Sequence, residues 1–454
     1  MPFYRIKSAS SIRGEILLPG DKSIAHRSVI ISSIARGNTY IYNFPKSQDC
    51  LRTLYALSKL GVKISRVKSN QANLCLCVKG KGLYSLKRPS ISIFAGNSGT
   101  TIRLLLGILA GQRFRVTLTG GRSLSRRPMR RVTEPLRRMG ADIHSKATRL
   151  SGKKLTQSEE EYPPLVLKGC NLHSIAYRMP IASAQVKSAL LLAGLYAKGV
   201  TRVIELLKTR DHTERMLEGF CADIKIKNKT IFIRGHKELV SPGIINIPGD
   251  ISSASFFITA ATLLPNSHLK IRSVGINPTR MGVIRVLERM GADIKIMPIS
   301  TITREPTGHI IVKSTKLRGT EINASEVGQL IDELPILMLA ACFARGRTVI
   351  YGVEELRFKE TDRINSMQDN LRKMGAKIYI RSYRSGLKRL REKIIIQGPS
   401  RLQGVRVSSF GDHRTAMSMI IAGLTCDGYN LIDDIECINK SFPDFLKTLT
   451  SVTK

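Results

Sequence analysis

Basic and acidic side chains occur together at several short turns of small and polar residues, each of which runs into an apolar stretch. The first turn carries Lys22 and Arg27, and the last carries Asp412 and Arg414. Lysine and arginine bind phosphate and carboxylate, and arginine does so through two parallel hydrogen bonds. A carboxylate can take a proton from a hydroxyl held within hydrogen-bond reach. The pattern therefore predicts a site for anionic substrates in which protons are moved.

The same kinds of side chain recur at the other turns of this type. In so basic a chain each cation alone is typical of a solvated surface, but at least five fall at equivalent turns with carboxylates among them. A helix that starts at such a turn presents free backbone N–H groups and the positive end of its dipole, which favours anions. The residues of interest are Lys22, Ser23, Arg27, Asn97, Ser98, Gly99, Thr100, Arg127, Ser183, Gln185, Asp332, Glu333, Lys359, Glu360, Arg363, Asp412, His413, Arg414 and Lys440.

A repeated segment positions these turns. It consists of the turn, an apolar helix and a β-rich exit, and its six copies begin at residues 20, 96, 181, 249, 332 and 411. Most copies are followed by an amphipathic helix that ends near a glycine, which is typical of a helix C-cap, and then by strands. Examples of this second part are LYALSKLGVKI, VTEPLRRMGADI and MQDNLRKMGAKIYI. Each unit is therefore predicted to fold as βαβαββ.

Two stretches half a chain apart begin alike: LPGDKSIAHR at 18–27 and IPGDISSAS at 247–255. Three units lie before the second stretch and three after it, so the sequence predicts an α/β protein of two pseudo-symmetric domains with three units each. The predicted first domain is 22–248, and the predicted second domain is 1–21 plus 249–454.

The two Pro-Gly-Asp stretches are predicted to be the points where the chain crosses between the domains, near 19–22 and 246–250. Proline fixes φ and glycine relaxes it, which suits a crossover. A strand expected before the first crossing, within 3–18, would then belong to the second domain. Charged insertions at 145–162 and 380–393 are predicted to be surface loops.

The composition limits the possible functions but does not select one of them. The formal net charge of the 454 residues is +39, which is compatible with a basic surface, with nucleic-acid binding or with attraction of small polyanions. Tryptophan is absent and aromatic residues make up 6%, which disfavours a base-stacking platform. Apolar runs are too short to span a bilayer and the N-terminus lacks a signal-peptide core, so we expect a cytoplasmic protein. The eight scattered cysteines predict neither structural zinc nor disulfides.

Seven motifs, in order along the chain, carry a family resemblance: PGDKSIAHR, GNSGTTIRLL, RPM, SAQVKSALLLAGL, DELPILMLAA, KETDRI and GDHRTAM. Together they resemble the 5-enolpyruvylshikimate-3-phosphate synthase family, in particular its second class. The resemblance implies an inside-out α/β barrel in each domain, with substrates in the cleft between the domains. It implies transfer of the enolpyruvyl group of phosphoenolpyruvate to the 5-hydroxyl of shikimate 3-phosphate through a tetrahedral adduct, the sixth step of the shikimate pathway. It further implies a monomer without metal or organic cofactor and without a membrane or specific nucleic-acid partner.

The resemblance also implies roles for individual residues. The implied catalytic residues are Lys22, Asp332, Glu360 and His413. The implied contacts to shikimate 3-phosphate are Lys22, Ser23, Arg27, Ser183, Ala184, Gln185, Arg210, Asp332 and Lys359. The implied contacts to phosphoenolpyruvate are Lys22, Asn97, Gly99, Arg127, Gln185, Arg363, Arg414 and Lys440. Lys22 and Glu360 are the candidates for the proton transfers, and the direction in which each acts stays open.

A few positions depart from the familiar family pattern. Ala184 replaces the second serine of Ser-Ser-Gln, so a phosphate contact there would come from its backbone N–H. Arg210 replaces a serine-containing segment and would restore a phosphate contact. These features are typical of the class known for poorer sensitivity to glyphosate, whereas Gly99 keeps the small residue of sensitive members, so the herbicide response stays open.

Two other functions compete with this interpretation. The enolpyruvyl transferase that acts on UDP-N-acetylglucosamine has the same fold, but its catalytic loop usually carries a cysteine, and residues 113–131 contain none. A nucleic-acid-binding protein, or an RNA-terminal phosphate cyclase built from related repeats, is motivated by the net charge and opposed by the carboxylates among the site cations.

Overall fold

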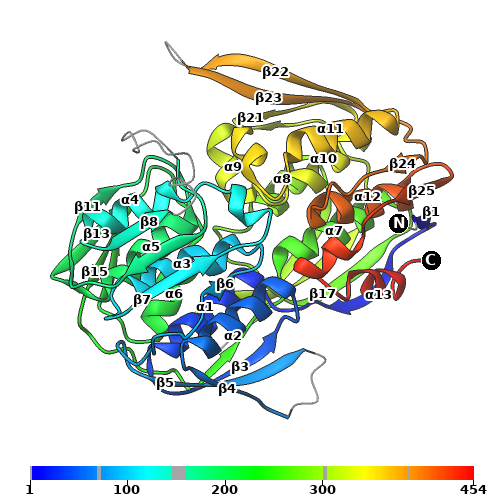
Figure 1. Ribbon diagram of the computed structural model, residues 1–454. Helices are drawn as coiled ribbons and strands as arrows, with labels where there is room; N and C mark the ends of the chain where they lie inside the picture. The colour runs from blue at the N-terminus through cyan, green and yellow to red at the C-terminus, as the bar shows by residue number, and fades with distance from the viewer. Residues whose placement is uncertain (1–2, 69–72, 146–159, 300–303, 386–388) are drawn as a thin grey trace. The chain divides into compact units, whose positions relative to one another are not determined.

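The computed structural model describes residues 3–68, 73–145, 160–299, 304–385 and 389–454, and the chain divides into two compact units. We call them the N-terminal unit and the C-terminal unit. The N-terminal unit consists of Lys22–Ile247 and Ile302–Glu305, and the C-terminal unit consists of Met1–Asp21, Pro248–Thr301 and Pro306–Lys454. Figure 1 labels the helices and strands of both.

The N-terminal unit contains three four-stranded sheets. Its strands are β3 (Arg36–Phe44), β4 (Lys63–Arg66), β5 (Leu74–Lys81), β6 (Ile93–Phe94), β7 (Arg115–Thr119), β8 (Asp142–Ser145), β9 (Leu165–Lys168), β10 (Leu172–His173), β11 (Ala176–Arg178), β12 (Ala197–Lys198), β13 (Val200–Ile204), β14 (Ile224–Lys227), β15 (Thr230–Arg234) and β16 (Ile244–Asn246). Its helices are α1 (Lys22–Ser33), α2 (Gln48–Lys59), α3 (Gly99–Leu109), η1 (Leu124–Arg126), α4 (Arg130–Arg138), α5 (Ala184–Gly194) and α6 (His212–Gly219). The sheet orders are β16-β3-β5-β4, β6-β7-β9-β8 and β11-β13-β15-β14.

The C-terminal unit repeats this plan. Its strands are β1 (Tyr4–Lys7), β2 (Arg13–Leu17), β17 (His268–Gly275), β18 (Asp293–Ile299), β19 (Thr307–Lys313), β20 (Glu321–Ile322), β21 (Gly346–Tyr351), β22 (Lys377–Ser385), β23 (Arg389–Gly398), β24 (Arg406–Val407) and β25 (Tyr429–Ile432). Its helices are α7 (Ile251–Leu263), α8 (Gly282–Arg289), α9 (Ala324–Leu330), α10 (Leu334–Phe343), η3 (Glu354–Phe358), α11 (Arg363–Lys373), α12 (His413–Thr425), η4 (Glu436–Lys440) and α13 (Phe445–Thr450). The sheet orders are β18-β19-β17-β2, β20-β21-β23-β22 and β1-β25-β24.

The strand pairing confirms the predicted βαβαββ unit. In the order β6, α3, β7, α4, β8 and β9, for example, β6 pairs parallel with β7, and β9 pairs antiparallel with both β7 and β8. The sheets β11-β13-β15-β14 and β20-β21-β23-β22 have the same pattern of one parallel and two antiparallel pairs. A parallel pair requires a crossover helix, and the first helix of each repeat supplies it.

Two strands are exchanged between the first repeats of the two halves. The strand β2 precedes α1 in the chain but pairs in parallel with β17, and β16 precedes α7 but pairs in parallel with β3. The two Pro-Gly-Asp stretches lie antiparallel at this point, since Asp21 N–H donates to the Pro248 carbonyl at 2.8 Å and Asp250 N–H donates to the Pro19 carbonyl at 3.0 Å. The strand β2, which the sequence analysis expected to belong to the second domain, thus pairs with a strand of the later half of the chain.

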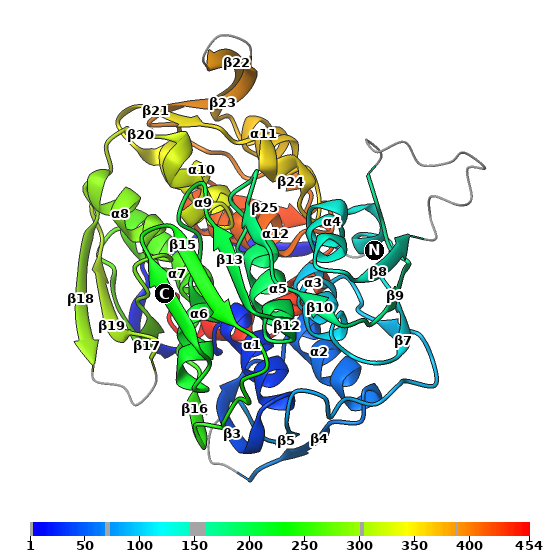
Figure 2. The ribbon, with the colours of Figure 1, turned by 90° about the vertical axis from the view of Figure 1, so that its left-hand side faces the viewer.

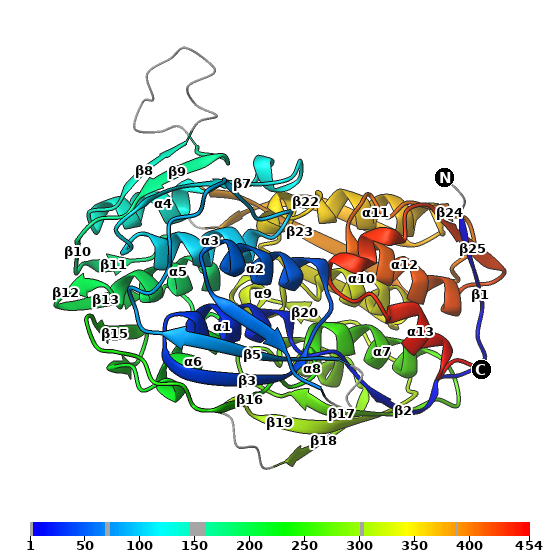
Figure 3. The ribbon, with the colours of Figure 1, turned by 60° about the horizontal axis from the view of Figure 1, so that its bottom comes forward.

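The first helices of the repeats form the interior of each unit. In the N-terminal unit α3 contacts both α1 and α5, and in the C-terminal unit α7, α10 and α12 contact one another, as Figure 3 shows for α10 and α12. These helices are buried on nearly all sides, polar residues included; α7, for example, buries twelve of its thirteen residues. The sheets lie outside them, and Figures 1 and 2 show α10 and α11 against one face of the sheet β20-β21-β23-β22.

The predicted glycine caps end the second helices. Gly61, Gly140, Gly291 and Gly375 follow α2, α4, α8 and α11 with φ between +83° and +101°, a left-handed conformation that glycine adopts without steric cost. After α6 the equivalent position is Cys221, with φ of +60°.

One loop prediction is wrong. Of residues 380–393, those up to Ser385 belong to β22 and those from Arg389 belong to β23, and these strands pair antiparallel up to Ser385 and Arg389. Ile378 and Ile394 on this hairpin are buried in the core, so the apolar alternation decided the structure despite the charges between. Most of the other predicted loop, 145–162, lies outside the described residues. Within the described part of the chain, no helix combines the length and apolar character needed to cross a membrane.

Candidate functional site

Lys22 is the first residue of α1 and forms an ion pair within the N-terminal unit. Its Nζ lies 2.9 Å from Oδ2 of Asp49, in the first turn of α2, and the two side chains are 19% and 13% exposed. The carboxylate holds the ammonium group at the start of the helix while part of it stays open to solvent. Sequence reasoning did not identify Asp49, because it stands in a stretch without a repeat signature.

Arg27 lies one turn further along α1 and is buried. Its Nε donates to Thr213 Oγ1 at 2.7 Å, its Nη1 to the Ser23 carbonyl at 2.8 Å and its Nη2 to Ser188 Oγ at 2.8 Å. These bonds fix the guanidinium in one orientation. The two predicted residues Ser23 and Arg27 are therefore in contact, through the Ser23 backbone and the Arg27 side chain.

Gln185 connects the start of α5 with the start of α3. Its Nε2 donates to Thr100 Oγ1 at 2.9 Å, and its Oε1 accepts from Nη1 of Arg103. Arg103 Nη2 donates to the Pro128 carbonyl at 2.9 Å, beside the predicted Arg127. Arg103 was not among the predicted residues, although its place in GNSGTTIRLL, one turn into α3, was the available signal.

Gly99 and Arg127 lie against each other. A Cβ atom added to Gly99 would be 3.1 Å from Nη1 of Arg127 and 3.6 Å from Nη1 of Arg103. Arg127 Nη2 is also 3.5 Å from Ser123 Oγ, and Asn97 Oδ1 accepts from the Leu124 N–H of the same loop at 3.4 Å. The absence of a side chain at position 99 therefore allows the guanidinium its close approach to the helix start.

The start of α5 and the segment before α6 hold the remaining predictions of this unit. Ser183 is the N-cap of α5 and its side chain accepts from Val186 N–H at 3.4 Å. Helix geometry leaves the N–H groups of Ala184 and Gln185 without an acceptor inside the helix, which suits an anion. Arg210 is half-buried between β13 and α6.

Arg363 is the centre of a second cluster, in the C-terminal unit. Its side chain is 1% exposed, and it pairs with Glu360 at 2.6 Å, Asp412 at 2.9 Å and Asp332 at 3.2 Å. Burial alone would lower the pKa of the guanidinium, but the three carboxylates raise it well above its ordinary value. Three motifs from two successive repeats, DELP and KETDR of the fifth and GDHR of the sixth, thus meet at one arginine.

The helix start of α12 adds further members to this cluster. Asp412 is the N-cap and accepts from the N–H groups of Arg414 at 2.7 Å and Thr415 at 3.3 Å. Arg414 in turn donates to the Asp332 carbonyl at 2.7 Å. His413, the first residue of the helix, is 2% exposed, and Lys440 donates to the Gly411 carbonyl at 2.7 Å.

Lys359 stands beside the same carboxylates. Burial lowers the pKa of its ammonium group, Asp332 opposes this effect, and Arg363 adds to it. A lysine with a lowered pKa gives up its proton more readily than a solvated one. The structure therefore brings the predicted residues Asp332, Lys359, Glu360 and Arg363 together.

Arg280 was missed by the sequence analysis. It is buried beside both Pro-Gly-Asp carboxylates, 3.4 Å from Asp250 and 3.8 Å from Asp21, and 3.7 Å from Glu333. The pKa of Asp250 is raised to about 6, by burial first and by the neighbouring Asp21 next, and Arg280 opposes both. The repeated aspartate in the two Pro-Gly-Asp stretches was the signal that a shared partner exists.

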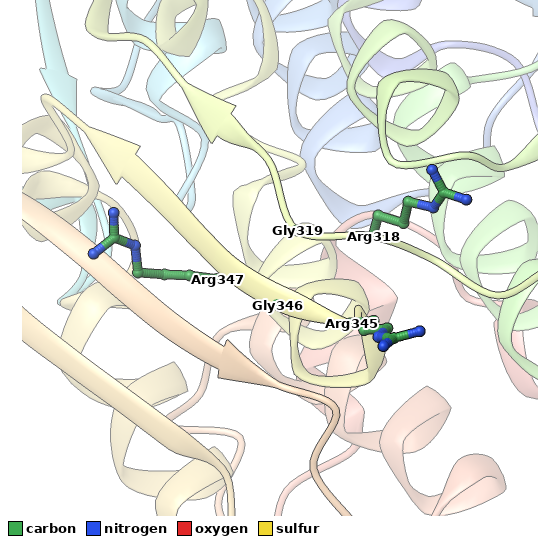
Figure 4. A pocket seen from close by; sticks show the side chains of 5 residues that line it. All are labelled: Arg318, Gly319, Arg345, Gly346 and Arg347. Atoms are coloured by element: carbon green, nitrogen blue, oxygen red, sulfur yellow. The ribbon is translucent and has the colours of Figure 1, made fainter.

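A pocket of about 500 Å³ lies elsewhere in the C-terminal unit. It is lined by Arg318, Gly319, Arg345, Gly346 and Arg347, and includes none of the predicted residues. Figure 4 shows Arg347 directed to one side and Arg318 and Arg345 to the other. The guanidinium groups do not converge, so we assign this pocket no anion. Among the described residues, no group of three or more histidine, cysteine, aspartate and glutamate side chains could hold a metal ion.

Comparison with known proteins extends over the whole chain. Residues 6–449 match the family model described as EPSP synthase (3-phosphoshikimate 1-carboxyvinyltransferase). The chain is 46% identical over 452 residues to the 3-phosphoshikimate 1-carboxyvinyltransferase of Geobacter metallireducens, with 100% of this chain and 99% of the relative covered. The structure of EPSP synthase from Acinetobacter baumannii superposes with a TM-score of 0.83 at 39% identity, covering 99% of this chain and 98% of that one.

A more distant structure shares the fold. The enolpyruvyl transferase NikO from Streptomyces tendae has a TM-score of 0.75 at 18% identity and covers 100% of this chain and 98% of its own. These two structural likenesses confirm the predicted fold class.

Proposed function

The chain belongs to the EPSP synthase family, and from this premise we propose that it transfers the enolpyruvyl group of phosphoenolpyruvate to the 5-hydroxyl of shikimate 3-phosphate and releases phosphate. This is the enolpyruvyl transfer step of the shikimate pathway, which leads to chorismate and the aromatic amino acids. The observation that carries the proposal is the cluster at Arg363, in which cations and carboxylates from three motifs lie within hydrogen-bond distance.

The first requirement of the reaction is to bring two anions together. Each substrate carries a phosphate and a carboxylate, and two like charges about 4 Å apart repel by about 4 kcal/mol at an effective dielectric constant of about 20. We propose that phosphoenolpyruvate is bound by the cations Arg127, Arg363, Arg414 and Lys22. The other proposed contacts of this substrate are Asn97, Gly99, Gln185 and Lys440. Shikimate 3-phosphate is proposed to be bound by Ser23, Arg27, Ser183, Ala184, Arg210 and Lys359.

The second requirement is to move two protons. The 5-hydroxyl must lose one as its oxygen bonds to the central carbon of phosphoenolpyruvate, and the methylene carbon must gain one. We propose Asp332 as the base for the hydroxyl, and Lys22 and Glu360 as the groups that serve the methylene, with His413 beside Glu360. Positive charge that builds at the central carbon is stabilised by carboxylates, which explains their presence among so many cations.

The third requirement is to collapse the tetrahedral adduct. The C–O bond to phosphate breaks, a proton leaves the methyl group, and the enol ether double bond forms. Between them, Lys22 and Glu360 are proposed to give a proton to the methylene carbon in the addition and to take one from the methyl group as phosphate leaves. We further propose that the protein works as a cytoplasmic monomer on these small anions, without cofactor or specific nucleic acid.

The test is phosphate release from phosphoenolpyruvate in the presence of shikimate 3-phosphate, with UDP-N-acetylglucosamine as the alternative acceptor. Release that depends on shikimate 3-phosphate alone is the expected result. Asp332→Asn should still bind shikimate 3-phosphate by calorimetry while turnover falls by about 10²- to 10⁴-fold, because a general base is lost. Turnover with the sugar nucleotide only, or salt-sensitive retention of RNA without turnover, would contradict the proposal.

A further inference from the structure

Lys187 is a buried lysine to which the proposed reaction gives no function. It lies in the first turns of α5, its side chain is 0% exposed, and its Nζ pairs with Glu214 at 2.6 Å and Glu205 at 3.0 Å. Lysine is almost never fully buried unless paired, since removing the ammonium group from water is costly. The burial of the Lys187 ammonium group therefore indicates a structural function for this residue.

The ion triad holds the loop that carries Arg210. Glu205 follows β13, and its Oε1 accepts from both the N–H of Thr209 at 2.9 Å and the Thr209 hydroxyl at 2.6 Å. Lys187 Nζ donates to the Thr209 carbonyl at 3.5 Å. Three polar groups of Thr209 are therefore fixed from the interior, directly before Arg210 in the chain.

The same triad joins α5 to α6 at the point where Arg27 is oriented. Glu214 belongs to α6, and its neighbour Thr213 accepts from Arg27 at 2.7 Å. Ser188, next to Lys187 on α5, contacts both the Thr213 hydroxyl at 2.7 Å and Arg27 Nη2 at 2.8 Å. Burial raises the pKa of Glu214, and the paired Lys187 opposes this effect.

We propose that Lys187 is a positioning residue for recognition of the substrate phosphate: through Glu205 and Glu214 it sets the loop of Arg210 and the helix start that orients Arg27. This inference rests on the proposed function, in which both arginines contact shikimate 3-phosphate. Lys187 acts through these arginines and contributes to the preference for a phosphorylated acceptor over the same acceptor without phosphate.

The experiment compares shikimate 3-phosphate with shikimate in Lys187→Met. The methionine keeps most of the apolar stem and removes the charge. We expect KM for shikimate 3-phosphate to rise about tenfold or more, with kcat reduced less than about threefold, because ground-state contacts are displaced. The ratio of kcat/KM for shikimate 3-phosphate to that for shikimate should fall by a similar factor, and KM for phosphoenolpyruvate should stay within about twofold.

Leu191→Ala is the matched control for a general loss of stability. Leu191 is a buried core residue of the same helix, so its truncation leaves a cavity without touching the ion triad. It should leave the preference for the phosphorylated acceptor unchanged. Glu205→Gln is a second variant should Lys187→Met fail to fold, and the preference should fall in it as well.

The outcomes separate the inference from the proposed function. A folded Lys187→Met or Glu205→Gln protein with an unchanged preference, beside a normally active wild type, would overturn the inference alone. An equal loss of preference in Leu191→Ala would also overturn it, since stability would then be the cause. Absence of turnover in the wild type with shikimate 3-phosphate and phosphoenolpyruvate would overturn the proposed function, and the inference with it.

Discussion

The first helices of the two units begin with different chemistry. In the N-terminal unit the N-caps of α3 and α5 are the hydroxyls of Ser98 and Ser183, whereas in the C-terminal unit the N-cap residues of α7, α10 and α12 are Asp250, Glu333 and Asp412. Hydroxyl and carboxylate side chains both suit the N-cap, but a carboxylate also offsets the positive end of the helix dipole. The starts of α3 and α5 therefore keep a stronger attraction for a phosphate.

The carboxylates at the helix starts of the C-terminal unit are matched by buried arginines. Arg280 lies 3.4 Å from the N-cap of α7, Arg363 lies 2.9 Å from that of α12, and Arg414 lies 3.8 Å from that of α10. Buried cations are costly unless paired, and buried carboxylates likewise. The starts of α3 and α5 are thus open, with uncharged caps, whereas those of α7, α10 and α12 carry paired charges, so a duplicated architecture can use two kinds of helix start.

Removal of Arg363 should have the largest effect on stability and on turnover. Arg363→Met leaves three carboxylates without their cation, and we expect a loss of about 3–5 kcal/mol in the free energy of unfolding, because an uncompensated buried charge remains. Turnover should be abolished. Urea unfolding followed by circular dichroism measures the stability.

Arg357→Met is the control for that prediction. Arg357 also bridges two carboxylates, Asp362 at 2.5 Å and Glu392 at 2.7 Å, but its side chain is 27% exposed. We expect its loss to cost about 1 kcal/mol or less, as for other solvent-exposed pairs. An equal loss in the free energy of unfolding for Arg357→Met and Arg363→Met would show that the burial of Arg363 does not make its ion pairs more important for stability.

The pH dependence of stability tests the carboxylate at α7. The pKa of Asp250 is about 6 in the folded protein against 3.8 as its ordinary value, so the folded state binds more protons between these two pH values. The contribution of Asp250 is therefore present below about pH 4 and is lost as the pH rises to about 6, by about 2–3 kcal/mol. Asp250→Asn should not show this loss. Its free energy of unfolding relative to the wild type should therefore rise by about 2–3 kcal/mol from pH 4 to pH 7. A constant difference between the two proteins across this range would contradict the prediction.

Much of the fold could be predicted because it is written locally and repeated. The turn, the buried helix and the glycine cap recur with their own periodicity, and the pairing of β2 with β17 follows from the repeat that begins at residue 249. The segment 380–393 was predicted to be a loop because of its charges, but its described residues pair in β22 and β23.

Partners that are distant in the sequence could not be predicted in the same way. Arg280 meets Asp21 and Asp250 only after the strand exchange, and Asp49 meets Lys22 only when α2 packs on α1. Spacing along the chain carries no information on such contacts, because each is decided by tertiary packing. The motif residues that bear functional groups were predictable, and the buried charges that orient them were not.

A carboxylate introduced at an open helix start should weaken binding of the anionic acceptor. Ser183→Asp keeps a good N-cap for α5, so stability should change by less than about 0.5 kcal/mol. The added charge should raise KM for shikimate 3-phosphate about tenfold relative to the isosteric Ser183→Asn, which loses the hydroxyl without adding charge. The difference between the two variants should shrink with added salt. A KM that is equal in both would show that the charge of the cap is irrelevant.

The smallest effect is expected at Gly99, where the open helix start of α3 meets Arg127. In Gly99→Ala the new Cβ would be 3.1 Å from Arg127 Nη1, so the guanidinium must move by a few tenths of an ångström. We expect KM for phosphoenolpyruvate to rise about three- to tenfold with kcat nearly unchanged, because the displaced contact serves binding. Alanine is the better helix former, so stability should be equal to or above that of the wild type by about 0.5–1 kcal/mol.

Gly328→Ala provides the matched control for this variant. Gly328 lies in α9 with no atom within 4 Å of an added Cβ, so it reports the helix-propensity effect alone. Its KM for phosphoenolpyruvate should match that of the wild type. If Gly99→Ala behaves as Gly328→Ala does, with greater stability and unchanged KM, the close approach of Arg127 to the helix start has no part in binding. In that case the difference between open and carboxylate-bearing helix ends would concern folding rather than the substrates.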